Sequence, residues 1–194
     1  MNKQDLRVIK GNKTFELLKK SLSELMIQTS YDQITIDAIC NKCGVTKGAY
    51  YHHFKTKDEL FRYLMAEKMD NYMTQIILKA KDEYEKEPKK QVECWIAGLQ
   101  NFVKENRKLL LGRLFISRSS DSWKALFDQW RTLVDELMET WQQDGILRSD
   151  ISIRELHQYL DSFTYGLSAL YTMDYIQVPF NDSLIQSFID TLFK

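Results

Sequence analysis

Glycine, proline and cysteine are all scarce in this chain. Its 194 residues include seven Gly, two Pro and three Cys. A turn-rich β-sandwich or a proline-rich linker needs more Gly and Pro, so long helices are the expected structure. An odd, small number of Cys does not fit the paired disulfide framework of a small secreted domain, which predicts a reducing, cytoplasmic setting.

Long apolar runs are absent as well. The best candidate, residues 109–116, is interrupted by Arg113, whereas a membrane-spanning helix needs about 18 apolar residues. The first 13 residues carry scattered charges and lack the apolar segment of a secretion signal. These absences predict a soluble protein that neither enters a membrane nor is secreted.

Net charge is also absent, because 27 Lys and Arg balance 27 Asp and Glu. The balance hides an asymmetry. Residues 1–57 hold ten basic and five acidic side chains, a net charge of +5, and the remainder carries −5. This division suggests a small basic module that meets a polyanion, joined to a larger acidic body. A solvated helix face would give the same charge pattern, so charge alone leaves both interpretations open.

The N-terminal quarter has the pattern of three short helices. Apolar residues recur at three- and four-residue steps from Lys13 to Gln28, as in a helix with one buried face. Thr35 is a typical helix N-cap, and Gly44 can end the second helix in the left-handed conformation. Thr46 then caps a third helix. Two short helices joined by a tight turn that contains Gly indicate a helix-turn-helix.

The remaining sequence is helical nearly throughout. A fourth helix is expected to start near residues 56–58 and to reach the charged stretch 79–90, and Pro88 suits the first turn of the next. Further helices are expected over about 109–122, 123–143 and 152–174, and after Pro179. The predicted fold is all-α with about nine helices: a three-helix helix-turn-helix domain over residues 1–56, and a helical bundle over residues 57–194.

Residues 35–61 show a family resemblance. They read TIDAICNKCGVTKGAYYHHFKTKDELF, with Gly-Val, then Thr-x-Gly-x-Tyr-Tyr-x-His-Phe, then Lys-x-Lys-Asp-x-Leu. This pattern resembles the DNA-binding domain of the Tet repressor (TetR) family of bacterial transcription regulators. The spacing, the glycines and the aromatic residues all coincide with the family's motif, whereas the chain beyond Leu64 resembles the family only in length and helical content.

The recognition helix is expected to begin at Thr46. Small residues at its start let the backbone approach a groove, its N–H groups favour a phosphate, and Lys47 can reach guanine O6 or N7. The resemblance implies that Thr35 and Thr46 bind phosphates and that Lys47 and Gly48 touch base edges. The predicted DNA-contacting residues are Thr35, Thr46, Lys47, Gly48, Ala49, Tyr51, His52, His53 and Lys57. Tyr51 could instead be a half-buried packing residue.

Other polar residues leave alternatives open. Lys3, Arg7 and Lys10 could form an arm in the minor groove or a solvated terminus. Cys40 and Cys43 are spaced C-x-x-C, which suggests zinc or redox chemistry with His52 or His53, but a second C-x-x-C pair is missing. The favoured interpretation is that both Cys pack as small hydrophobes, without a metal or cofactor. His157 could face a pocket or an interface, or be structural.

The four Trp all lie in the second domain, where they could line an aromatic cavity or fill a core. Few basic residues interrupt the apolar stripes, which disfavours an anionic effector such as a nucleotide or an acyl-CoA. The predicted walls of a ligand pocket are Trp95, Leu99, Phe102, Phe115, Phe127, Trp130, Phe163 and Tyr171.

The expected function is that of a ligand-responsive regulator. Family members pair their last two helices into a homodimer, and a dimer suits a palindromic operator on double-stranded DNA. A repressor released by a small hydrophobic effector is the first hypothesis. An activator, or a regulator of the same fold that answers to a protein partner, is the alternative. The sequence shows no catalytic constellation, so a helical enzyme, or a protein that binds anionic lipid through its basic end, is a remote third class.

Overall fold

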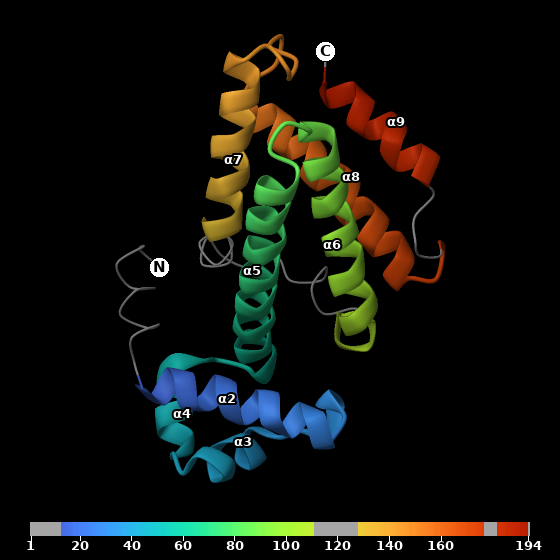
Figure 1. Ribbon diagram of the computed structural model, residues 1–194. Coiled ribbons are helices and arrows are strands. Elements are labelled where there is room, and N and C mark those ends of the chain that lie inside the picture. The colour runs from blue at the N-terminus through green and yellow to red at the C-terminus, as the bar shows by residue number, and fades with distance from the viewer. Residues whose placement is uncertain (1–12, 111–127, 177–181, 194) are drawn as a thin grey trace. The chain divides into compact units, whose positions relative to one another are not determined.

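The computed structural model describes residues 13–110, 128–176 and 182–193. Over these residues the secondary structure is α-helical, with no β-strand, which confirms the predicted all-α fold. No helix in this part of the chain is long and apolar enough to cross a membrane. The helices are α2 (Lys13–Gln28), a 3-10 turn η1 (Tyr31–Gln33), α3 (Ile36–Cys43), α4 (Lys47–His53), α5 (Lys57–Glu83), α6 (Pro88–Leu110), α7 (Asp128–Gln143), α8 (Ile153–Thr172) and α9 (Asp182–Leu192) (Figure 1). The helix expected over 109–122 lies almost wholly outside the described residues.

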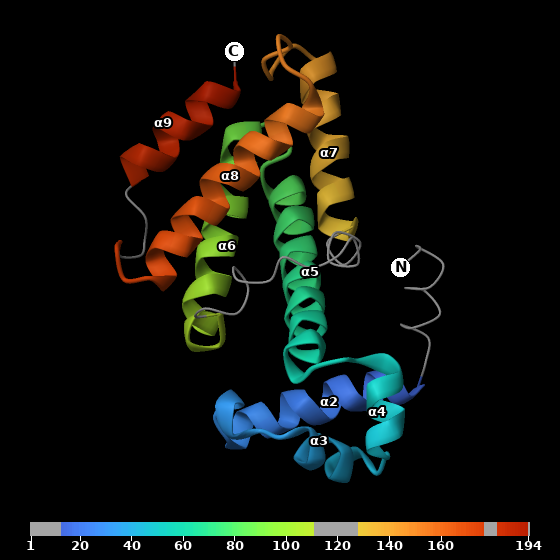
Figure 2. The same cartoon turned by 180° about the vertical axis from the view of Figure 1, so that it is seen from behind.

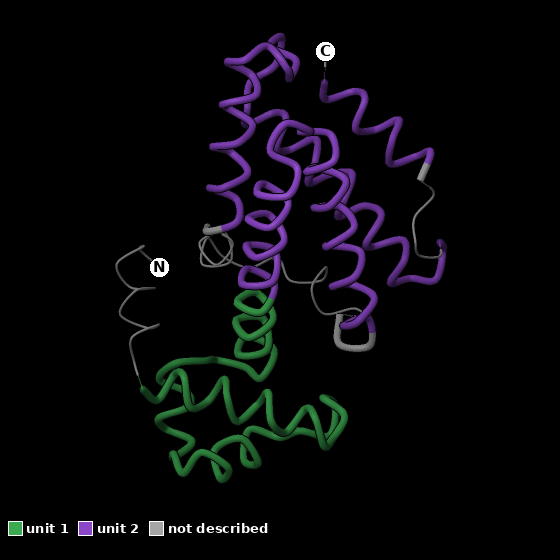
Figure 3. Tube along the Cα trace, in the orientation of Figure 1, with its two compact units in different colours: residues 1–68, 116–127 green, residues 69–115, 128–194 purple. Residues whose placement is uncertain are grey.

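The chain divides into two compact units within α5 (Figure 3). The described part of unit 1 runs from Lys13 to Lys68, and unit 2 starts at Met69. Unit 1 thus extends beyond the boundary predicted after residue 56. The reason is that the first turns of α5 complete its core, where Leu60 and Phe61 are fully buried.

Unit 1 is a three-helix module closed by the start of α5. Helix α2 packs against α3 and α4, which also pack against each other. An aromatic cluster fills the centre: Phe15 stacks on Phe54 with ring centroids 4.8 Å apart, and Tyr63 meets both rings edge-on. Burying large aromatic side chains in this way is a main source of stability in so small a core.

The helix ends of unit 1 lie where the sequence predicts them. Thr35 caps α3 by accepting a hydrogen bond from Ala38 N at 3.1 Å, and Thr46 caps α4 by accepting one from Ala49 N at 3.2 Å. Gly44 ends α3 at φ 70°, in the left-handed region of backbone conformation that residues other than glycine rarely adopt. These local interactions hold α3 and α4 in a helix-turn-helix.

Unit 2 is a helical bundle. Helix α8 packs on α6 and α7, and α9 packs on α6 (Figures 1 and 2). Trp95 of α6 stacks on Trp141 of α7 with centroids 5.5 Å apart, so two of the four Trp do fill the core. Ser152 starts α8 with a full capping box, in which Ser152 and Glu155 each bond the other's backbone N–H.

Candidate nucleic-acid interface

The start of α4 is exposed and free of bulky groups. Lys47 and Gly48 are exposed, and Ala49 is half-buried. A Cβ added at Gly48 would meet only the Thr46 hydroxyl, at 3.7 Å. None of the described residues therefore requires Gly at this position, and among them the space over this turn is open to an outside molecule.

Lys47 pairs with a carboxylate of the preceding helix. Its Nζ lies 2.7 Å from Asp37 Oδ1, and this hydrogen bond is the main cause that raises the pKa of Lys47. Both side chains are more than half exposed, so water and salt screen the pair. The ammonium can exchange Asp37 for an acceptor on DNA at little cost.

The rest of α4 has an inner and an outer face. Tyr50 is fully buried, and its OH donates to Thr56 O at 3.0 Å, whereas Tyr51 is 54% exposed. The Tyr51 ring also meets that of Tyr50 edge-on, with centroids 5.6 Å apart, so a contact between Tyr51 and DNA stays a prediction beside the alternative of a half-buried packing residue. His52 is exposed beside it, while His53 is half-buried against Phe15, and that burial lowers the pKa of His53.

Lys57 has a structural role that the sequence did not predict. Its Nζ donates to Tyr31 O at 2.8 Å and to Ile34 O at 2.7 Å, and it lies 4.2 Å from the centroid of the Tyr31 ring. The ammonium therefore closes the turn around η1 from inside unit 1. The contact between Lys57 and DNA stays a prediction, and the ammonium already donates two of its three hydrogen bonds to carbonyls of the protein.

The two N-terminal cysteines lie in the packing of α3. Cys40 is buried, and burial raises the pKa of its thiol. The Cys43 thiol donates to Ile39 O at 3.1 Å. Within the ranges described, no three His, Cys, Asp or Glu side chains gather as metal ligands would. The predicted arm of Lys3, Arg7 and Lys10 lies outside the described residues.

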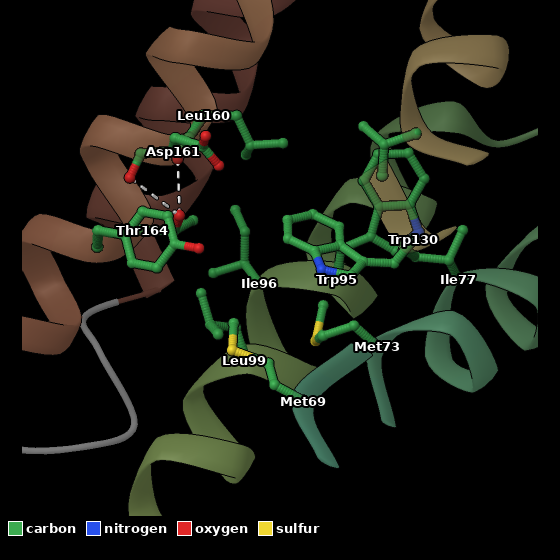
Figure 4. A pocket seen from close by; sticks show the side chains of 12 residues that line it. Met69, Met73, Ile77, Trp95, Ile96, Leu99, Trp130, Leu160, Asp161 and Thr164 are labelled. Carbon is green, nitrogen blue, oxygen red and sulfur yellow. Dashed lines mark hydrogen bonds between the residues drawn. The ribbon is translucent and has the colours of Figure 1, made fainter. Parts of the chain in front are cut away.

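Unit 2 contains a cavity between α5, α6, α7 and α8 (Figure 4). Its free interior measures about 20 Å³, room for about one water, and the space between its walls and out to the rim is about 410 Å³. The lining residues are Met69, Met73, Ile77, Trp95, Ile96, Leu99, Trp130, Val134, Leu160, Asp161, Thr164 and Tyr165. Apolar side chains dominate, as in many sites for small molecules.

Three of the predicted pocket residues line this cavity: Trp95, Leu99 and Trp130. Other predicted walls lie elsewhere, because the apolar stripes of the helices continue past the cavity. Phe102 packs on Tyr72, Phe163 stacks on Phe188 at 3.8 Å between centroids, and Tyr171 lies under the guanidinium of Arg107. The remaining two, Phe115 and Phe127, fall outside the described residues.

Sequence reasoning missed the polar side of the cavity. The Asp161 carboxylate pairs with Arg131 of α7, and His157 Nδ1 lies 2.5 Å from Asp135 Oδ1. Burial raises the pKa of Asp161, against the opposing effect of Arg131 and His157. The available signal was spacing: Arg131 and Asp135, like His157 and Asp161, stand four residues apart and so share a helix face.

Some polar atoms near the cavity are buried without a hydrogen-bond partner among the described residues: Trp95 Nε1, Trp130 Nε1 and His157 Nε2. The Thr164 hydroxyl, in contrast, donates to the Leu160 and Asp161 carbonyls of its own helix (Figure 4). Burial raises the pKa of Tyr165 to about 12, so its OH stays protonated at neutral pH. The cavity therefore has both an apolar surface and polar groups that lack partners.

Comparison with known proteins gives a family for the helix-turn-helix. Residues 21–64 match the family model described as "Bacterial regulatory proteins, tetR family". The chain is 45% identical over 47 residues to the Transposon Tn10 TetC protein of Escherichia coli. It is 32% identical over 84 residues to the uncharacterized HTH-type transcriptional regulator YwcC of Bacillus subtilis. These matches cover 24% and 43% of this chain, and 24% and 37% of the relatives' own lengths.

Solved structures share the whole fold at low identity. A protein of unknown function from Rhodococcus sp. RHA1 has a TM-score of 0.65 at 14% identity, covering 94% of this chain and 97% of that one. A TetR-family transcriptional regulator from Haemophilus influenzae has a TM-score of 0.60 at 20% sequence identity, and the match covers 93% of this chain and 97% of that one. The transcriptional regulator FadR from Bacillus subtilis, in complex with stearoyl-CoA, has a TM-score of 0.58 at 16% sequence identity, and the match covers 91% of this chain and 96% of that one.

Proposed function

We propose that this chain, which belongs to the tetR family of bacterial regulatory proteins, represses transcription. In this proposal a homodimer binds a palindromic operator, and a small hydrophobic effector releases it from the DNA. The observation that carries the proposal is the open first turn of α4, where Lys47 is exposed and, among the described residues, only the Thr46 hydroxyl lies near Gly48. A helix that presents such a turn can bring its backbone close to base edges.

Lys47 is the residue proposed to read a base. A lysine in the major groove donates to guanine O6 and N7, and this contact specifies sequence, whereas phosphate contacts mainly position the protein. Thr35, Thr46, Tyr51 and His52 are proposed to hold the phosphate backbone, because they are polar and exposed on the same two helices.

Selection from a random library of duplex DNA tests this assignment. The full-length protein should enrich a two-fold symmetric motif, and Lys47→Ala should lower affinity about tenfold and relax the preference at one position of each half-site. Lys20→Ala is the matched control, because Lys20 is 74% exposed on α2, outside the recognition helix. An unchanged motif with Lys47→Ala would show that α4 does not read the base.

The dimer is proposed to form through α8 and α9. Large apolar side chains stand exposed on these helices: Tyr159 is 57%, Leu170 43% and Leu184 47% exposed. Tyr159 and Leu170 stand eleven residues apart and so share one face of α8, and exposed apolar residues on one face are typical of a surface that another protein covers. One helix-turn-helix makes few base contacts, and a dimer doubles them.

The cavity is the proposed effector site, and α5 is the proposed link to DNA. Met69, Met73 and Ile77 of α5 line the cavity, while Leu60 and Phe61 of the same helix lie in the core of unit 1. An effector larger than a water has to displace lining residues, and displacement of Met69 and Met73 would act on α5. It can shift the DNA-binding equilibrium only by its difference in affinity for the two states, typically about 1–3 kcal/mol.

The effector is proposed to differ from that of FadR. The stearoyl-CoA in the FadR complex carries several phosphate charges, whereas the lining of the present cavity includes no Lys or Arg among the described residues. Burying such charges without cationic partners would cost several kcal/mol.

The small interior of the cavity favours one alternative: a regulator of this fold that a protein partner controls, as repressor or activator. Mass spectrometry of small molecules that copurify with the protein separates the two. A bound small molecule that is displaced when operator DNA is added supports the effector. A DNA affinity that no small molecule changes, together with a copurifying protein that changes it, supports the alternative.

A further inference from the structure

Two hydrogen-bond acceptors lie close together in unit 2, one on the cavity residue Asp161 and one on His157, which lies behind the lining residues. His157 and Asp161 are on successive turns of α8, and His157 Nε2 is 3.8 Å from Asp161 Oδ1. The Asp161 carboxylate belongs to the cavity wall, and the His157 ring lies 6.1 Å from that of Trp130, another wall residue. This distance lets one donor atom reach both acceptors, since a hydrogen bond spans about 2.7–3.2 Å.

His157 Nε2 needs such a donor. The His157 side chain is 7% exposed, and its Nδ1 lies 2.5 Å from Asp135 Oδ1. When Nδ1–H of the neutral ring donates to Asp135, Nε2 is left as an acceptor. That nitrogen is buried and has no hydrogen-bond partner among the described residues. A buried acceptor without a donor is costly, so a ligand that supplies the donor gains affinity.

The charges around this point favour a cation. Asp135 and Asp161 contribute two negative charges, and Arg131 contributes one positive charge, so the cluster carries −1 when His157 is neutral. Burial disfavours the charged form of Asp161 and raises its pKa even beside Arg131, and a second cation would stabilise that charge.

We propose that the cavity takes an organic ammonium ion, whose N–H groups donate to Asp161 Oδ1 and His157 Nε2 while its apolar body lies against Met69, Met73, Trp95 and Trp130. This inference rests on the proposed effector function of the same cavity. The aromatic faces of Trp95 and Trp130 attract a cation as well as an apolar chain. The two methionines are flexible and can move to enlarge the small interior.

Four decyl compounds test the ligand class, because they share one apolar chain and differ in the head group. Calorimetric titration of the full-length protein at pH 8 is expected to show decylammonium binding at least tenfold tighter than decan-1-ol or decanoate. Decyltrimethylammonium should bind more weakly than decylammonium, because it carries the charge without an N–H donor. Decan-1-ol or decanoate binding as tightly as decylammonium would overturn the proposal.

Two variants with opposite expected effects separate binding from folding. Asp161→Asn should lower the affinity for decylammonium about tenfold or more. Arg131→Gln removes the competing cation, so the affinity of that variant for decylammonium should be equal to that of the parent or higher. A purely structural role of the Arg131–Asp161 pair predicts weaker binding in both. Asp150→Asn is the matched control, because Asp150 is an exposed carboxylate of unit 2 that pairs with Arg148. Equal binding by Asp161→Asn and the parent, or loss in Arg131→Gln, would contradict the proposal.

Release of DNA distinguishes this inference from the proposed function. If decylammonium binds through Asp161 but leaves DNA affinity unchanged, the ligand class stands and the proposed coupling fails. If decan-1-ol releases DNA from the parent and from Asp161→Asn alike, the effector function stands and the ammonium proposal is wrong.

Discussion

Two lysines with the same signal in the sequence have different roles in the structure. Both Lys47 and Lys57 stand at helix starts within the DNA-binding motif, and both were predicted to contact DNA. Lys47 lies exposed beside Asp37, whereas Lys57 turns inward to the carbonyls of Tyr31 and Ile34. The sequence could not show this, because those carbonyls belong to a turn more than twenty positions earlier in the chain.

Replacing Lys57 should reduce stability before it affects DNA recognition. Lys57→Met removes the ammonium from the Tyr31 and Ile34 carbonyls, while Ile34 N still donates to Tyr31 O. We expect this loss to cost about 1–3 kcal/mol in the free energy of unfolding measured with urea. Lys55→Met is the control, because Lys55 is an exposed neighbour. Unchanged stability with a large loss of DNA affinity would instead assign Lys57 directly to DNA.

If Lys47 binds DNA as proposed, its partner Asp37 competes with DNA for the ammonium. Asp37→Asn removes the partner of Lys47 and a negative charge near the phosphates, so DNA affinity should rise roughly two- to fivefold at low salt, with less gain at high salt. Fluorescence anisotropy with labelled duplex measures this. Asp82→Asn removes an equal charge from the C-terminal part of α5 and should have no such effect. Lower affinity with Asp37→Asn would mean that Asp37 positions Lys47 for the base.

Helices with strong local signals could be predicted from the sequence, and the cavity they enclose could not. Thr35, Gly44 and Thr46 end or begin helices in the structure as predicted, because capping depends on neighbouring residues alone. The cavity walls depend on how helices pack. The sequence pattern therefore does not indicate Met69 and Met73, and Phe102 and Phe163, which it predicts as walls of a ligand pocket, do not line this cavity.

Helix α4 offers a variant that separates folding from DNA binding. Gly48→Ala places a methyl group where only the Thr46 hydroxyl lies nearby, and Ala favours a helix by about 1 kcal/mol over Gly. We expect stability in urea to be equal or higher and DNA affinity to fall about tenfold or more, because the methyl group faces the base edges. Unchanged affinity would show that this turn does not approach DNA closely.

The net charge of the chain is zero because a basic N-terminal part and an acidic remainder cancel. The basic share of the sequence coincides with the helix-turn-helix, and the acidic share with the bundle that holds the cavity and the exposed apolar residues of α8 and α9. A polyanion is expected to meet the first and be repelled by the second. The proposed pairing of two chains rests on the exposed apolar residues, which the charge pattern does not reveal.

Breaking the proposed dimer should weaken DNA binding without any change in the recognition helix. Leu184→Glu adds a charge to the exposed apolar surface of α9, so sedimentation should show a monomer, and operator affinity should fall about tenfold or more. Leu78→Glu is the control, because Leu78 is 48% exposed on α5. A dimer that persists in Leu184→Glu would place the interface elsewhere.

The central claim is that two copies of this chain read one symmetric site through α4. Mapping the stretch of genomic DNA that the full-length protein protects from cleavage tests this claim most directly. The account predicts a two-fold symmetric site with half-sites about 10 base pairs apart or a multiple of that spacing, and protection of that site by Gly48→Ala only at about tenfold or more higher protein concentration. Protection without sequence preference, or of a site lacking two-fold symmetry, would contradict it.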